Sequence, residues 1–207
     1  EAQGRVASAA VLRELGVLPC KSLAQAQSAL DATRLAFVPI GLLSPALAQL
    51  LALRARLGTS ACARQIARLA DPFNGEGLKL VPADDEDEKT ALATVLGLHE
   101  EHALLFVGTE GEAYVNPLQR PAIVHFRSGE ASLLFDAEAP HVPSPAGPQA
   151  DAKSSARWIQ SALAGKAPLP SPMARLLASC LYGAGLCDEL HEAMALVALR
   201  TCGQAAA

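Results

Sequence analysis

The spacing of apolar residues changes along the chain, and the changes predict helices that alternate with short strands. Ser22, followed three residues later by Gln25, forms a capping box that predicts a helix start. Ser44 before Pro45 is a second start signal, because proline is favoured in the first helical turn. Together with glycine stops, these signals predict helices over 6–16, 22–33, 45–58 and 61–70.

Short continuous apolar runs predict strands, and the run over 103–107 is the strongest buried-strand signal in the chain. Five consecutive acids at 84–88 favour a helix start, because the positive end of the helix dipole attracts negative charge. The remaining strands are expected over 35–39, 78–81, 122–126 and 131–135, the last two as a hairpin. Three further helices are expected over 152–164, 172–182 and 189–199, after a proline-rich loop at 140–148.

This order of elements predicts an α/β fold. We expect a mostly parallel sheet with an antiparallel hairpin at one side and helices on both faces. With 207 residues, the chain is expected to form a single domain over 1–207 that includes C-terminal helices within 152–199. Apolar residues make up 51% of the chain but aromatic residues only 4%, so alanine, leucine and valine must build the core.

Composition narrows the classes of protein that the chain can represent. The net charge of −4 provides no basic footprint for nucleic acid over the whole chain, although a local basic patch remains compatible with it. The five cysteines form no Cys-x-x-Cys pair, which favours reduced thiols in a cytoplasmic protein over disulfides or a zinc site. The most apolar run, 42–53, is too short to cross a membrane.

The common nucleotide-binding and hydrolase motifs are absent from the sequence. His99 and His102 are three residues apart, which permits a metal pair, but no third ligand lies nearby and a helix end is the alternative. The Gly108–Glu112 loop follows the strongest strand, where α/β sheets bind ligands. Its acids, Glu110 and Glu112, either hold a metal ion or belong to an ordered turn.

A basic cluster is the remaining chemical feature. Arginine forks are suited to phosphate or carboxylate groups, but arginines near helix ends also bind carbonyls or point into water. Both interpretations remain open for the four arginines concerned, which are Arg54, Arg56, Arg64 and Arg68.

Several short motifs together resemble the anthranilate phosphoribosyltransferases (glycosyltransferase family 3). The family has a His-Pro-Ala helix start, a Val-Arg-x-x-Leu-Gly stretch, an Asn-Pro ending, a His-Ala-Leu strand and an Ala-Leu-Tyr-x-Ala-Gly terminus. The corresponding stretches here are Ser44–Ala46, Leu53–Gly58, Asp71-Pro72, His102–Gly108 and Cys180–Gly185. Their order and spacing extend the resemblance over 6–199, which implies the α/β phosphoribosyltransferase fold.

The chain departs from the family at the positions that bind phosphoribosyl pyrophosphate, magnesium and anthranilate. The family's Gly-Thr-Gly-Gly-Asp loop for phosphoribosyl pyrophosphate would lie before Glu1, so we expect a longer parent chain with an N-terminal helical region. An aspartate of the family is replaced by Ala10, and the Asp-Glu pair for the second magnesium is replaced by Ala113 and Tyr114. Of the residues that would face anthranilate, only Arg54 remains.

These losses resemble a divergent bacterial branch of the fold, the YbiB type, whose members are homodimers that bind nucleic acid. The resemblance therefore implies a non-catalytic or catalytically degenerate protein that binds nucleic acid through backbone phosphates, with the four arginines as its site and no cofactor in this chain. One alternative is a phosphoribosyltransferase with an altered acceptor, which would need magnesium and phosphoribosyl pyrophosphate. The third is a scaffold for dimerisation or partner contact.

Overall fold

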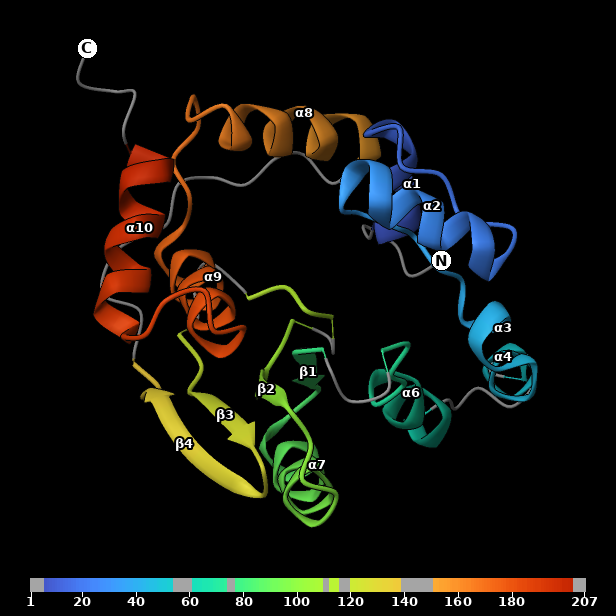
Figure 1. The fold of residues 1–207 in the computed structure, drawn as a ribbon, viewed down its shortest axis with the longest axis horizontal. Coiled ribbons are helices and arrows are strands. Elements are labelled where there is room, and N and C mark those ends of the chain that lie inside the picture. Colours follow the sequence, from blue (N-terminus) through green and yellow to red (C-terminus); the bar gives the residue numbers. More distant parts are fainter. Residues whose placement is uncertain are drawn as a thin grey trace. The chain divides into compact units, whose positions relative to one another are not determined.

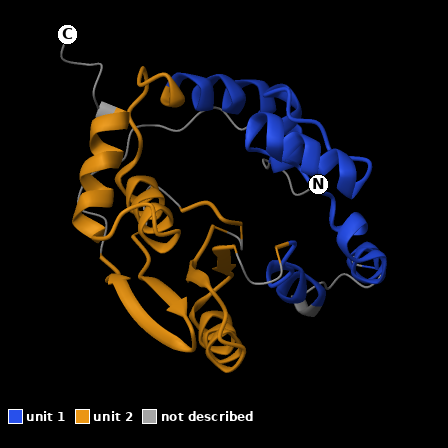
Figure 2. Ribbon diagram, viewed as in Figure 1, with its two compact units in different colours: residues 1–72, 147–161 blue, residues 73–146, 162–207 orange. Residues whose placement is uncertain are grey.

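The computed structural model of the chain describes residues 6–53, 61–73, 77–109, 112–115, 120–138 and 151–202. Two compact units divide the stretch that we expected to form one domain (Figure 2). Unit 1 comprises 1–72 and 147–161, and unit 2 comprises 73–146 and 162–207. No helix among the described residues is long and apolar enough to cross a membrane.

Unit 1 is helical in its described part, and two of its helices begin at the residues that the sequence predicted. The Ser22 hydroxyl accepts a hydrogen bond from the Gln25 amide at 3.1 Å, and the Ser44 hydroxyl accepts one from Leu47 at 3.3 Å. The helices are α1 (Ser8–Glu14), α2 (Leu23–Thr33), α3 (Ile40–Leu43), α4 (Pro45–Ala52), α6 (Ala61–Arg68) and most of α8 (Ala152–Leu163) (Figure 1).

The strand predicted over 35–39 is wrong. Its only ladder contact among the described residues is an isolated parallel bridge between Pro19 and Phe37, closed by a 2.8 Å hydrogen bond from the Cys20 amide to the Phe37 carbonyl. Pro39 cannot donate to a ladder and instead precedes α3 as its N-cap. An apolar run therefore formed a short extended connection here, because no neighbouring strand in the described part of unit 1 is available to it.

Unit 2 contains a four-stranded sheet in the order β1-β2-β3-β4. β1 and β2 are parallel and are connected through α7, whereas β2 with β3 and β3 with β4 are antiparallel. Ser128 and Gly129 form the hairpin turn, both with positive φ (52° and 80°), as a type I′ turn requires. The elements are β1 (Lys79–Ala83), α7 (Glu86–Leu98), β2 (Ala103–Val107), β3 (Ile123–Arg127) and β4 (Glu130–Phe135).

Helices lie on both faces of this sheet (Figure 1). α7 packs on β1 and β2, while α9 (Ser171–Gly183) packs on β2 and β3 from the other side and supports α10 (Leu190–Cys202). The core beneath α9 is formed by Leu104, Phe106, Val115, Ile123 and Leu176. The predicted α/β fold, with its antiparallel hairpin and its helices on both faces, is confirmed.

Candidate functional sites

The predicted basic cluster is described only in part, on α6 of unit 1. Arg64 and Arg68 are four residues apart on this helix, so their side chains leave the same face one turn from each other. Both are half-buried, and both take part in contacts within the protein. Arg54 and Arg56 lie outside the described residues. The structure therefore brings together two of the four predicted arginines.

α6 owes its position to α4, on which it packs. Pro45 occupies the first turn of α4, and Leu47 buries its side chain beneath the helix. The α6 sequence, Ala-Cys-Ala-Arg-Gln-Ile-Ala-Arg, contains no acid, so both arginines lie on a helix without an internal ion pair. This arrangement is compatible with binding an anion.

The described residues of the loop after β2, 108–109 and 112–115, lie close together in unit 2, with an antiparallel bridge between Thr109 and Glu112. The Gly108 amide donates to the Ala83 carbonyl at 2.9 Å, and the Glu112 amide donates to the Thr109 carbonyl at 3.1 Å. A Cβ atom at position 108 would lie 2.2 Å from the Glu112 carbonyl oxygen, so only glycine fits there. The turn interpretation of this loop therefore has direct structural support.

The metal interpretation has no such support in the described part of the loop. Glu112 and Ala113 are exposed, and Glu110 lies outside the described residues. Tyr114 is 42% exposed, and the partial loss of solvent around its phenol raises the pKa of that group. No three His, Cys, Asp or Glu side chains come together among the residues that the structure describes. These residues do not provide the carboxylate pair that a second magnesium ion needs.

The acidic run at 84–88 and the pair of His99 and His102 have structural roles. Asp85 caps α7 by accepting a 2.8 Å hydrogen bond from the Glu88 amide, and the Glu88 carboxylate accepts one from the Asp84 amide. His99 is the exposed C-cap of α7, while His102 Nε2 donates to the Gly183 carbonyl at 2.9 Å. The acidic run is thus a helix start, and His99 ends α7 whereas the His102 side chain contacts α9.

An ion-pair cluster that no motif predicted joins the chain after β4 to α9. Glu138 accepts hydrogen bonds at 2.8 Å from both Arg120 and Arg175, and these bonds hold the pKa of its carboxyl below the usual value. The Arg175 guanidinium also lies 5.2 Å from the centre of the Phe135 ring. The members of this cluster are far apart in the sequence, so no local pattern could have revealed it.

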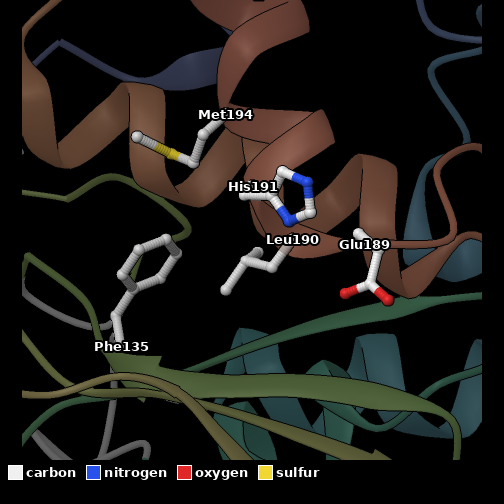
Figure 3. Close-up of a pocket in the computed structure, with 5 residues that line it drawn as sticks. All are labelled: Phe135, Glu189, Leu190, His191 and Met194. Carbon is white, nitrogen blue, oxygen red and sulfur yellow. The ribbon is translucent and has the colours of Figure 1, made fainter.

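The Phe135 ring also lines a pocket of about 470 Å³ between β4 and the start of α10 (Figure 3). Phe135, Leu190 and Met194 contribute apolar side chains, which point toward a common space in the close-up. Glu189 and His191 add two titratable groups to the lining. This mixture is typical of a surface depression that can take a small amphipathic group.

Comparisons with known proteins fit this fold. No family model matches the chain. The uncharacterized protein YbiB of Escherichia coli (strain K12) is 32% identical over 195 residues, which cover 93% of this chain and 61% of YbiB. The crystal structure of anthranilate phosphoribosyltransferase (TrpD) from Thermus thermophilus matches with a TM-score of 0.73 at 20% identity, over 98% of this chain and 62% of that enzyme.

The chain thus spans about three fifths of the length of either protein. The predicted resemblance in fold is confirmed, and the similarity to YbiB extends over nearly all of the chain. This protein has the α/β fold of anthranilate phosphoribosyltransferase.

Proposed function

We propose that this chain is part of a protein that binds nucleic acid through backbone phosphates, with the arginines of α6 among the contacts. The observation that carries the proposal is the local charge. Between Ser44 and Phe73 the sequence has four arginines and a single aspartate, a net charge of +3, whereas the whole chain has a net charge of −4. This segment is therefore a basic region within an acidic chain, as phosphate binding requires.

The two arginine side chains of α6 are suited to phosphate contacts. A guanidinium carries five N–H donors in a planar fork, so Arg64 and Arg68 can keep contacts within the protein and still donate to a phosphate. Their separation by one helical turn allows both to contact one strand. Contacts of this kind read no bases, so we expect binding with little sequence preference.

The residues that replace the family's metal ligands support a loss of catalysis. Phosphoribosyl transfer needs charge compensation at the departing pyrophosphate, which magnesium normally supplies. Ala113 and Tyr114 stand where the resemblance places the carboxylate pair, and neither side chain is a magnesium ligand. A phosphoribosyltransferase with an altered acceptor is the competing function, and magnesium-dependent binding of phosphoribosyl pyrophosphate by the parent protein would favour it.

We further propose that the parent protein is a homodimer. Unit 1 buries few apolar side chains among its described residues, namely Cys20, Ala26, Leu47 and Ala156. It exposes Leu18, Leu23, Leu35 and Leu50, each by more than half of its surface. The proposal is that a second copy of the protein covers these leucines. Sedimentation velocity of the parent protein tests this, and a monomer at micromolar concentration would contradict it.

The phosphate-binding proposal is tested by removing the α6 charges. The double variant Arg64→Ala/Arg68→Ala should weaken binding to labelled oligonucleotides of any sequence and lower the slope of log K against log salt by about 1.4–1.8. The matched control is Arg13→Ala/Arg157→Ala, which removes the same charge from two exposed positions of unit 1. If the α6 variant binds with the same salt dependence as the wild type, the basic region is not the nucleic-acid site.

A further inference from the structure

His125 is a titratable side chain buried in unit 2 that has no part in the proposed function. It lies on β3, its exposed fraction is 6%, and its Nε2 atom has no hydrogen-bond partner in the described structure. The ring packs 5.4 Å from the His102 ring and 5.9 Å from the edge-on Tyr182 ring, measured between centroids. A buried imidazole between two aromatic neighbours is tolerated while it is neutral.

The C-terminal end of α9 covers this imidazole. A Cβ atom added to Gly183 would lie 3.6 Å from His125 Nε2 and 3.0 Å from a methyl group of Leu78, so the helix end approaches the sheet closely. His102 Nε2 donates to the Gly183 carbonyl at 2.9 Å, which fixes the helix end beside the His125 ring. Water can therefore reach His125 Nε2 only when the last turn of α9 moves away from the sheet.

The charges around His125 oppose a further positive charge. On the sheet, Arg127 is two residues along β3 and is paired in register with Glu130 of β4, and His102 precedes β2. Arg175, the charged residue of α9, is held by Glu138, and Lys79 of β1 is paired with Glu101. Burial, His102 and Arg127, in that order, lower the pKa of His125 below its usual value of 6.5.

We propose that uptake of a proton by His125 releases the C-terminal turn of α9 from the sheet, so that acid opens this part of unit 2. Release of the helix end exposes the imidazolium to water. It also breaks the His102–Gly183 hydrogen bond and the contact between Tyr182 and His125. The released state takes up the proton with the ordinary pKa near 6.5, whereas the closed state takes it up only at lower pH. The closed state is therefore fully favoured above about pH 7, and its advantage falls as the pH drops below about 6.5.

Hydrogen exchange followed by mass spectrometry measures the opening directly. After correction for the intrinsic pH dependence of exchange, amides in the last turn of α9 should exchange faster below pH 6.5, by up to about tenfold per pH unit, the limit for one proton. Amides of α7, on the opposite face of the sheet, serve as the internal reference. An acid-independent rate in α9 would overturn the proposal.

Two variants separate His125 from its neighbour. His125→Gln cannot take up a proton in this range, so its α9 exchange should lose the acid response, whereas His99→Gln, at an exposed position, should keep it. His102→Gln retains a donor for the Gly183 carbonyl and should also respond to acid. If the response disappears in His102→Gln but persists in His125→Gln, the proposal is wrong. If His125→Gln does not fold, an imidazole titration of wild-type His125 by NMR decides, because a midpoint at or above 6.5 would contradict the proposal.

Discussion

Gly108 provides the sharpest test of the described geometry, because its surroundings leave no space for a side chain. An added Cβ atom would lie 2.2 Å from the Glu112 carbonyl oxygen, which is 0.8 Å inside the 3.0 Å that real Cβ atoms respect. It would also lie 2.8 Å from Cβ of Pro82. Both neighbours are parts of the main chain or of a rigid ring, so neither can move aside cheaply.

The expected cost of Gly108→Ala follows from two contributions. Forcing a methyl group into a packed site costs about 1–3 kcal/mol. Displacing the loop also weakens the hydrogen bond from the Gly108 amide to the Ala83 carbonyl, which contributes about 1 kcal/mol. We therefore expect the free energy of unfolding of unit 2 to fall by about 2–4 kcal/mol.

The chain contains optical probes for each unit separately. Both tyrosines, Tyr114 and Tyr182, lie in unit 2, and the single tryptophan, Trp158, lies in unit 1. Urea denaturation followed through tyrosine signals should show the loss of stability in Gly108→Ala. The matched control is Gly97→Ala in α7, where the added Cβ meets no atom within 4 Å and should stabilise the helix by about 0.5–1 kcal/mol. A Gly108→Ala variant within about 0.5 kcal/mol of the wild type, the range usual for surface changes, would refute the described loop.

Two other predictions concern single side chains. Ser22→Ala should lower the stability of unit 1 by about 1 kcal/mol, because it removes the acceptor for the Gln25 amide, and an unchanged Trp158 urea transition would contradict this. Cys180, whose pKa is raised to about 11 by burial, should react with iodoacetamide at pH 8 at least about 100-fold more slowly than a free cysteine, because only about 0.1% of it is thiolate. Labelling of Cys180 at the free-cysteine rate in the folded protein, detected by mass spectrometry, would show that this side chain of α9 is not packed against the core of unit 2.

The sequence predicted the elements whose signals are local. The Ser22 capping box, the helix start at Asp85 and the hairpin turn at Ser128 and Gly129 all depend on residues within a few positions of one another. The predicted strand over 35–39 failed because a strand also needs a partner, and partners are determined by the tertiary fold.

The distinction between local and long-range signals also applies to the candidate sites. The α6 arginines could be identified from the sequence because they are neighbours on one helix. The contacts of Glu138 with Arg120 and Arg175, and of His125 with Tyr182, join residues that are far apart in the chain. Histidine and arginine are common on strands and helices, so nothing in the local sequence distinguished these members from ordinary surface residues.

The most direct test of the central claim is a fluorescence-anisotropy titration of this chain and its full-length parent, side by side. Labelled single- and double-stranded oligonucleotides of two unrelated sequences would be used at two salt concentrations. The proposed function predicts binding by the parent that weakens steeply with salt and differs little between sequences, with this chain retaining part of it. Absence of binding by both proteins at low salt would contradict the claim and direct attention to phosphoribosyl pyrophosphate with magnesium.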